Sequence, residues 1–368
     1  MTVSTHSETL QLKPRAHQAV SCMIIRGGTS KGLYFHKDDL PGDKTTRDEL
    51  LIRIMGSPDP KQIDGLGGAT PVTSKIAIVS RSQRVGVDID YEFAQVLVGR
   101  PEIDFPTCGN ILSGVGIFAL ETGLIKPSAP ETILTIYDVN IGAHVKQTIQ
   151  TPEHKLSWHG SKEISGVPGT AAPIVMELSN IVGGKTGKMH PSGNKIDVID
   201  GVRMSLIDVA MPCMYVLASD VGLSGTESKH DLDANKPLLE KLLSLRIKAG
   251  ERMGIINVAK KVYPKIALVS EEITAAGMIR SRYFTPYVCH DAYAASGAFS
   301  LAAACIDTGT IPSEIFTQAT DNPFKVTIAH PSGTMPVELS IKDNDITKLS
   351  VKVVRTARPL MLGAAYLP

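Results

Sequence analysis

A cysteine followed by glycine and asparagine opens the stretch of this sequence best suited to chemistry. Cys108, Gly109 and Asn110 precede a nearly uncharged run that extends to Leu120. Because an uncharged helix has to be buried on all sides, the run predicts a central helix that begins at Cys108. The positive end of a helix dipole favours a thiolate, and the free N–H groups of a first turn could bind a carboxylate or a phosphate. The stretch therefore predicts a reactive thiol beside an anion site.

A second stretch repeats this pattern. It runs from Cys289 to Leu301, with glycine, phenylalanine and leucine at the same distances from its cysteine, and the apolar run after Lys265 resembles the run after Lys75. Two echoes in the same order indicate a duplicated unit. We therefore expect a second buried helix that begins at Cys289. We also expect Cys108 and Cys289 to face each other across a cleft, with the two lysines at its rim.

Such a cleft would suit proton transfer. Two proton carriers on opposite sides of a bound carbon acid can remove and return a proton, and N–H groups at helix starts can stabilise the enolate-like charge. A lysine base must be largely neutral, which requires burial or a cationic neighbour. Each residue also has a structural interpretation, since a cysteine on an apolar helix is usually inert packing. That interpretation fits Cys22, Cys213 and Cys305, whereas no bulky residue shields Cys108.

Turns rich in glycine and hydroxyl residues are further candidates for anion binding. The first is Arg26-Gly27-Gly28-Thr29-Ser30-Lys31-Gly32, which follows an apolar strand. It lacks the P-loop pattern, in which Ser or Thr follows the lysine, so a simple hairpin turn is the alternative. The first four residues of the turn His190–Asn194 return at His330–Gly333, and these two histidines could serve only to order their turns. His290 could cap its helix or bind a substrate.

Composition narrows the class of protein. The chain has 368 residues, of which 43% are hydrophobic and 5% aromatic, and its net charge is +1. This balance predicts two ordinary domains and no nucleic-acid partner. Five cysteines without a CxxC pair and histidines without ligand spacing argue against a disulfide framework or a metal site. Free thiols favour a reducing compartment, the cytoplasm, and without a long apolar run we expect no membrane association. Residues 1–18 are polar and are expected to form a mobile tail.

The repeat determines the predicted fold. Each half should contain a hairpin, an amphipathic helix (45–55 and 237–249), a strand that begins at a lysine, and a buried helix. We place the boundary near Ile199, which gives halves 1–198 and 199–368, with the option that the last strand returns to the first half. Short strands with one buried helix per half predict an α+β fold in which each curved sheet wraps around its central helix.

Several motifs resemble the 2-methylaconitate cis–trans isomerase (PrpF) family, which also includes 4-oxalomesaconate tautomerases, 3-methylitaconate isomerases and aconitate Δ-isomerases. The likeness begins near residue 20 and is most specific in the first half. Besides the turn at Arg26, its motifs are Met55–Pro60, Gln62–Gly68, Thr73-Ser74-Lys75, Cys108-Gly109-Asn110, Ser192-Gly193-Asn194, Tyr283-Phe284-Thr285-Pro286, His330–Gly333 and Val354-Arg355-Thr356. The resemblance implies the diaminopimelate-epimerase fold, with two pseudo-symmetric halves and the active site in the cleft between them.

The resemblance also implies a reaction, a cofactor-independent allylic 1,3-proton shift in an unsaturated di- or tricarboxylate. Its catalytic pair corresponds here to Lys75 and Cys108, and the sequence leaves open which of them is the base. Cys289 resembles the second cysteine of the epimerases and is treated as facing the substrate. The residues expected to bind substrate are Arg26, Gly28, Thr29, Ser30, Ser74, Gly109, Asn110, Ser192, Gly193, Asn194, Lys265, Arg282, Cys289, His290 and Ser332.

The chain departs from the family pattern at Ser192, where threonine is common, and at Asp291 and Tyr293. Its Tyr-Phe-Thr-Pro and Cys-His features favour the aconitate and oxalomesaconate subgroup. The leading hypothesis is an isomerase of an aconitate-like tricarboxylate, and a 4-oxalomesaconate tautomerase or a methylaconitate isomerase is the near alternative. An amino-acid racemase or epimerase with Cys108 and Cys289 as paired bases and a non-catalytic carboxylate-binding protein are the further alternatives. A homodimer is the default expectation.

Overall fold

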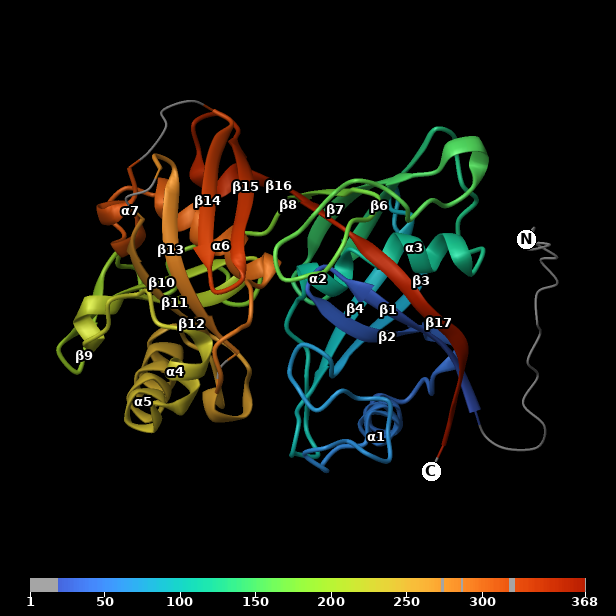
Figure 1. Ribbon diagram of the computed structural model, residues 1–368, viewed down its shortest axis with the longest axis horizontal. Coiled ribbons are helices and arrows are strands. Elements are labelled where there is room, and N and C mark those ends of the chain that lie inside the picture. The colour runs from blue at the N-terminus through green and yellow to red at the C-terminus, as the bar shows by residue number, and fades with distance from the viewer. Residues whose placement is uncertain (1–18, 273–274, 286, 318–321, 368) are drawn as a thin grey trace.

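The computed structural model describes residues 19–272, 275–285, 287–317 and 322–367, so the expected tail at residues 1–18 lies outside the described residues. Within them the strands join into one continuous 17-stranded sheet, and the elements gather into two halves that lie side by side (Figure 1). The first half contains β1 (Ala19–Gly27), β2 (Ser30–His36), α1 (Lys44–Met55), β3 (Lys75–Arg81), β4 (Ile89–Val96), β5 (Ile103–Asp104), α2 (Gly109–Leu112), α3 (Val115–Glu121), β6 (Glu131–Asp138), β7 (Ala143–Gln150) and β8 (Ile174–Ser179).

The second half follows the same plan. It contains β9 (Asp197–Ile199), β10 (Val202–Val209), β11 (Met211–Leu217), α4 (Lys229–Ala234), α5 (Lys236–Arg252), β12 (Lys265–Glu271), β13 (Met278–Phe284), α6 (Ala295–Ile306), α7 (Ile311–Ile315), β14 (Phe324–His330), β15 (Gly333–Ile341) and β16 (Leu349–Arg355). The last strand, β17 (Ala357–Tyr366), runs back and pairs antiparallel with β1 in the first half. A second connection is the antiparallel pair of β8 and β16.

The order of strand pairing shows the duplication. In the first half, β1–β2 is antiparallel, β2–β3 parallel, β3–β4 antiparallel, β4–β6 parallel and β6–β7 antiparallel. The pairs β10–β11, β11–β12, β12–β13, β13–β14 and β14–β15 repeat this order. Lys75 begins β3 and Lys265 begins β12, each at the first pair of a parallel ladder. The predicted α+β fold of two pseudo-symmetric halves is therefore confirmed.

Buried helices lie at the centre of both halves, as the uncharged runs predict. Every residue of α6 from Ala295 to Cys305 is buried, and so is every residue of α3 from Val115 to Leu120. These helices share one hydrophobic core that includes residues of both halves. Two further cores lie beneath α1 and α5, on the other face of each sheet. The part of the sheet that belongs to each half is thus packed on both faces, and the two halves are joined through their central helices.

The first central helix differs from its prediction because it is broken after one turn. The side-chain oxygen of Gln147 accepts the N–H of Gly116 (2.9 Å), and its amide nitrogen donates to the carbonyl oxygens of Leu112 (3.2 Å) and Ser113 (3.3 Å). These bonds replace the helical ladder between α2 and α3. Because α2 has only four residues, Cys108 lies beside a single turn and not at the start of a long dipole.

The second central helix begins at Ala295, so the prediction that it begins at Cys289 is wrong. The N–H of Cys289 donates to Asp233 Oδ1 (2.7 Å), and the next N–H donates to the carbonyl oxygen of Tyr283 (2.7 Å). These bonds hold the segment in an extended conformation against β13. Cys108 is the residue before α2 and Ala294 the residue before α6, so the counterpart of the first thiol is an alanine.

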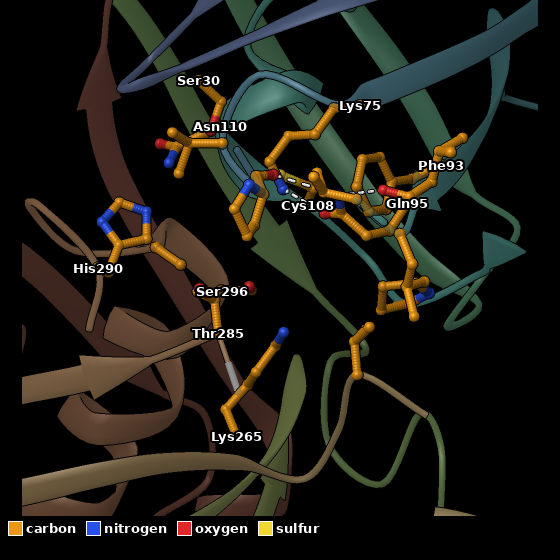
Figure 2. A pocket seen from close by; sticks show the side chains of 18 of the residues that line it. Ser30, Lys75, Phe93, Gln95, Cys108, Asn110, Lys265, Thr285, His290 and Ser296 are labelled. Carbon is orange, nitrogen blue, oxygen red and sulfur yellow. Dashed lines mark hydrogen bonds between the residues drawn. The ribbon is translucent and has the colours of Figure 1, made fainter. Parts of the chain in front are cut away.

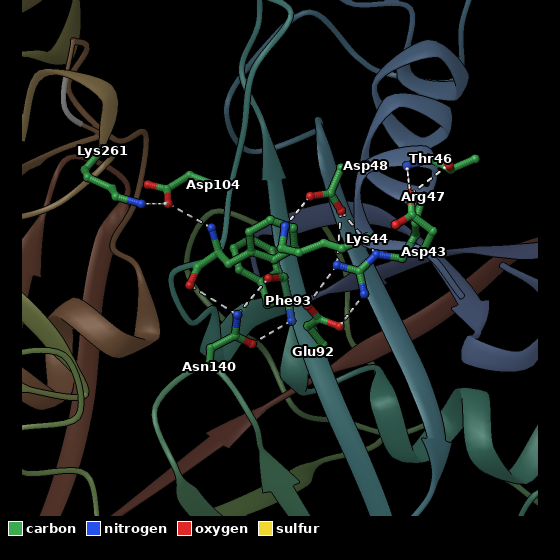
Figure 3. Close-up of polar contacts among 11 residues, drawn as sticks. Asp43, Lys44, Thr46, Arg47, Asp48, Glu92, Phe93, Asp104, Asn140 and Lys261 are labelled. Atoms are coloured by element: carbon green, nitrogen blue, oxygen red, sulfur yellow. Dashed lines mark hydrogen bonds and ion pairs between the residues drawn. The ribbon is translucent and has the colours of Figure 1, made fainter. Parts of the chain in front are cut away.

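Polar contacts fix the outer wall of the first half and join it to the second (Figure 3). Arg47 of α1 donates to Glu92 of β4 (2.9 Å), which holds the helix on the sheet. Asp104, at the end of β5, accepts the backbone N–H of Val262 from the second half (2.8 Å) and lies 3.4 Å from the Lys261 amino group. The loops on either side of the cleft are therefore tied together at this point.

Candidate active site

A cavity of about 340 Å³ lies between the halves at the starts of the central helices. Lys75, Cys108 and Asn110 line it from the first half, while Lys265 and His290 line it from the second (Figure 2). Among the described residues around this cavity there is no aspartate or glutamate, whereas Arg100 adds a third cationic side chain. The arrangement favours an anion with several carboxylates.

Lys75 is held by its neighbours on β4. Its Nζ donates to Gln95 Oε1 (2.7 Å) and lies 5.0 Å from the centre of the Phe93 ring. The amide nitrogen of Gln95 in turn donates to the carbonyl oxygen of Ser74 (2.9 Å), which fixes the orientation of the amide. Ser74 itself is fully buried, and its hydroxyl donates to Gln62 (2.7 Å), so it supports the turn before β3 and does not line the cavity.

Cys108 stands between a strand and the one-turn helix α2. Its backbone is extended, no side chain caps the helix, and its carbonyl oxygen accepts from the Tyr91 hydroxyl (3.2 Å). The preceding Thr107 donates its hydroxyl to the buried carboxyl of Asp138, whose pKa burial raises to about 6. A second bond to this carboxyl comes from the backbone N–H of Asn140 (2.9 Å). The chain that presents the thiol is thus anchored on its first-half side.

The turn that begins at Arg26 packs against Asn110. The Asn110 amide nitrogen donates to the Thr29 hydroxyl (3.0 Å), and a Cβ at Gly28, where φ is +51°, would lie 2.3 Å from Asn110 Oδ1. This close approach requires glycine. Ser30 Oγ and Asn110 Oδ1 are buried without a hydrogen-bond partner among the described residues, and both side chains line the cavity. They are available to a bound ligand.

A buried histidine faces the cavity from the second half. His290 Nδ1 accepts the backbone N–H of Ala292 (2.9 Å), so the neutral ring carries its proton on Nε2. Burial, with a contribution from the charge of Lys75, lowers the pKa of His290 to about 3. The neutral imidazole is therefore a hydrogen-bond donor at physiological pH.

Lys265 approaches from the side opposite Lys75 (Figure 2). Its side chain is 8% exposed, and within the described part of the chain its amino group makes no hydrogen bond or ion pair. Burial lowers the pKa of Lys265 to about 7, and the positive charge of Lys75 adds to this effect. Burial and a cationic neighbour are the two conditions that keep a lysine partly neutral, and here they meet at Lys265.

Cys289 does not face Cys108. Its side chain is 1% exposed and packs in the core beneath α5, and burial raises its pKa to about 12. The same effect raises the pKa of Cys213 to about 12 and that of Cys22 to about 11, as expected of thiols that serve as packing. The prediction that two thiols face each other across the cleft is therefore wrong. Cys108 is the thiol that lines this cavity.

Other expected ligands of the substrate are occupied elsewhere. Arg26 Nη1 donates to the carbonyl oxygens of Gly28 (3.1 Å) and Thr356 (2.8 Å), which ties the residue between β16 and β17 to the turn. Arg282 donates to the carbonyl oxygen of Glu227 (2.7 Å), and the hydroxyl of Ser332 to that of Asp291. None of these three side chains lines the cavity in the structure.

The turn at Ser192, Gly193 and Asn194 also lies outside the cavity. Asp197 accepts from the Ser192 hydroxyl (2.5 Å) and from the Asn194 amide (3.1 Å), so the polar groups of the turn satisfy one another. Gly109 has a packing role, because a Cβ at this position would lie 2.8 Å from the Cβ of Ala295. It lets the two central helices meet at their first residues.

Several lining residues escaped the sequence analysis. They include Gln95, Arg100, Thr107, Tyr287 and Ser296. Gln95 carried one usable signal, since it is the polar residue in the apolar end of β4. The others lie in loops or at the first turn of α6, where residue type alone does not mark a ligand.

Two negative findings apply to the residues that the structure describes. No helix among them is both long and apolar enough to cross a lipid bilayer. No group of three or more His, Cys, Asp or Glu side chains in the described ranges is arranged to hold a metal ion.

This fold of two duplicated halves is also that of solved isomerases and epimerases. A solved hydroxyproline epimerase from Agrobacterium vitis has this fold, with a TM-score of 0.60 over 96% of this chain and 94% of that chain, and at 11% identity the likeness concerns the fold alone. A solved methylitaconate-delta-isomerase is more similar, with a TM-score of 0.76 and 35% identity over 95% of this chain and 96% of that chain.

Sequence comparison identifies the family, because the model of the PrpF protein family matches residues 17–368. The chain belongs to this family and is an isomerase. It is 43% identical over 350 residues to YbhH of Escherichia coli (strain K12), named as an isomerase without a stated substrate, and the match covers 95% of this chain and 99% of that protein. It is 42% identical over 355 residues to a (4E)-oxalomesaconate Delta-isomerase of Novosphingobium sp. (strain KA1), with 96% and 99% covered.

Proposed function

We propose that the protein moves a C=C bond in an unsaturated tricarboxylate, such as cis- or trans-aconitate, by an allylic 1,3-proton shift without a cofactor. The charge of the cavity carries this proposal. Lys75, Arg100 and Lys265 line it, and none of its described lining residues is acidic. A site of this kind binds a polyanion and stabilises additional negative charge on the substrate. The relative named for (4E)-oxalomesaconate supports oxalomesaconate as the second candidate substrate.

The proton transfer is assigned to the two candidates of the first half, Lys75 and Cys108. The Cys108 thiolate takes a proton from the allylic carbon, and the electron pair spreads through the double bond onto the adjacent carboxylate. Lys75 contacts the amide oxygen of Gln95 and the ring of Phe93, two partners that attract a positively charged ammonium group. It donates a proton to the far allylic carbon. Transfer of a proton from the thiol to the amine then restores the starting state. The reverse reaction exchanges the two roles.

The remaining polar groups of the cavity would hold the carboxylates. The His290 Nε2–H, the Ser30 hydroxyl and the Lys265 amino group are donors without a carboxylate partner in the described chain. Donors that are already oriented stabilise the charge of a dienolate without the reorganisation that water would need. The five cysteines are all free, which supports the cytoplasm as the compartment of the enzyme.

The racemase alternative requires a second base opposite the first. The residue that corresponds to Cys108 in the second half is Ala294, and Cys289 is buried in another core. An amino-acid substrate would also need an acidic partner for its ammonium group, and the described lining residues offer none. These observations favour the double-bond isomerase.

The test is proton NMR in D2O with cis-aconitate, trans-aconitate and 4-oxalomesaconate in turn. We expect deuterium at an allylic carbon together with a shifted double bond. Cys108→Ala and Lys75→Met should each lower the rate by at least about 100-fold, as expected for the loss of a positioned acid or base. Cys289→Ala is the matched control and should exchange normally.

Two outcomes would contradict the proposal. Full activity of Cys108→Ala would remove the thiol from the mechanism. Tight binding of the tricarboxylates without incorporation of deuterium would instead identify a carboxylate-binding protein that retains the fold.

A further inference from the structure

Arg100 lines the open side of the cavity, in the loop after β4. Its guanidinium lies 5.2 Å from the centre of the Tyr287 ring, and its Nη1 lies 3.5 Å from the hydroxyl of that tyrosine. Tyr287 belongs to the second half, so the contact spans the cleft. Lys75 is partly buried and Lys265 is 8% exposed, whereas Arg100 is exposed, which places Arg100 nearest to solvent.

The guanidinium of Arg100 has no carboxylate partner among the described residues. Two other exposed or half-buried arginines differ in this respect, since Arg84 pairs with Asp90 (3.0 Å) and Arg203 with Glu314 (2.7 Å). A guanidinium stacked on a tyrosine has its orientation fixed by the ring, while its N–H groups stay available in the plane. Such a group is suited to bind a planar carboxylate through two parallel hydrogen bonds.

We propose that Arg100 binds the carboxylate furthest from the reacting carbons and thereby selects tricarboxylates over dicarboxylates. This inference rests on the proposed function and names the residue that determines its substrate class. Lys75 acts at the reacting carbons and Lys265 reaches in from the opposite half, which leaves Arg100 for a third carboxylate at the mouth. On binding, the carboxylate would replace the Tyr287 hydroxyl as the partner of Nη1, and the stacking contact would remain.

The experiment compares two ligands that differ by one carboxylate. Propane-1,2,3-tricarboxylate has no double bond to move, and methylsuccinate is the same molecule with one terminal carboxylate replaced by hydrogen. Their dissociation constants are measured by calorimetry for the wild type, Arg100→Gln and Arg100→Lys. Arg203→Gln, which removes an exposed arginine outside the cavity, is the control for the change in net charge.

We expect Arg100→Gln to weaken binding of the tricarboxylate by about 10- to 100-fold, the usual cost of a hydrogen-bonded charge, and to leave methylsuccinate within about twofold. Arg100→Lys should recover part of the loss, because it keeps the charge without the planar fork. For a substrate found by NMR, Arg100→Gln should raise KM by the same factor and leave kcat within about twofold. Arg203→Gln should change neither ligand.

Equal weakening of both ligands would overturn the inference, since it would mean a general loss of positive charge or of contact between the halves. Unchanged affinity for the tricarboxylate would overturn it as well. Its failure is distinguishable from that of the proposed function. An active enzyme whose selectivity survives Arg100→Gln refutes only the role of Arg100, whereas selective binding without proton exchange refutes only the isomerase.

Discussion

The surroundings of Lys265 lead to a specific prediction, which is that the binding of a tricarboxylate weakens as the pH rises above neutrality. In the free protein the pKa of Lys265 is lowered to about 7, first by burial and then by the charge of Lys75. Arg246 lowers it further, while Asp104 and Cys213 oppose the shift. Below pH 7 the amine is protonated and attracts a carboxylate, and above pH 7 it is neutral. A bound carboxylate raises the pKa again, so binding above pH 7 takes up a proton.

The size of the effect follows from this shift. Each pH unit above the free-state pKa costs about 1.4 kcal/mol of binding free energy, which corresponds to tenfold in the dissociation constant. With a free-state pKa of about 7, the affinity at pH 9 should be about 100-fold lower than at pH 6. His290 does not contribute, because its pKa of about 3 keeps it neutral throughout this range. The carboxylates of the ligand are fully ionised above pH 7.

The assay is calorimetric titration of propane-1,2,3-tricarboxylate into Cys108→Ser protein, which lacks the thiol and therefore cannot turn over a substrate. Measurements at pH 8 in two buffers of different ionisation enthalpy should show uptake of close to one proton. Lys265→Met should bind more weakly at pH 6 and lose the dependence on pH. A constant affinity of the Cys108→Ser protein from pH 6 to pH 9, or the same slope in Lys265→Met, would refute the reasoning.

Three further variants test the geometry. Cys289→Ala should keep kcat/KM within about twofold, because the thiol is buried outside the cavity. Gly109→Ala should lower the free energy of unfolding in urea by about 1–3 kcal/mol, because the new methyl group meets Ala295 at 2.8 Å, and adding Ala295→Gly should recover most of the loss. Gln147→Leu should cost about 2–3 kcal/mol in the same assay, since it leaves three backbone groups between α2 and α3 unpaired. Wild-type stability of either variant would contradict the packing described.

The elements that local sequence determines could be predicted. The strands that begin at Lys75 and Lys265 have apolar runs after a polar start, and the two central helices are uncharged, so their burial follows from composition. The start of the second central helix could not be predicted in this way. It depends on a bond between the Cys289 N–H and Asp233, which are far apart in sequence, and the alanine-rich segment around residue 294 carries no competing signal.

The candidate anion-binding turns show a second feature that residue spacing in the sequence could not predict. The turns at Arg26 and at Ser192 are both rich in glycine and hydroxyl residues. Ser30 of the first turn lines the cavity, whereas the polar side chains of the second turn donate to the nearby Asp197. Whether a hydroxyl finds its partner within the turn or in a ligand depends on tertiary packing. Arg100 escaped notice for the converse reason, because an arginine in a loop is ordinary until a cavity and a tyrosine of the other half are placed beside it.

The return of β17 to β1 affects the order in which the protein can fold during its synthesis. Domains usually fold from the N-terminal end as the chain leaves the ribosome. Here β1 forms a ladder with β2 on one side and with β17 on the other, so its second edge stays open until β17 has been made. Closing so long a loop costs conformational entropy and slows folding. The first half therefore reaches its final structure last, and the cavity is completed only after synthesis of the second half.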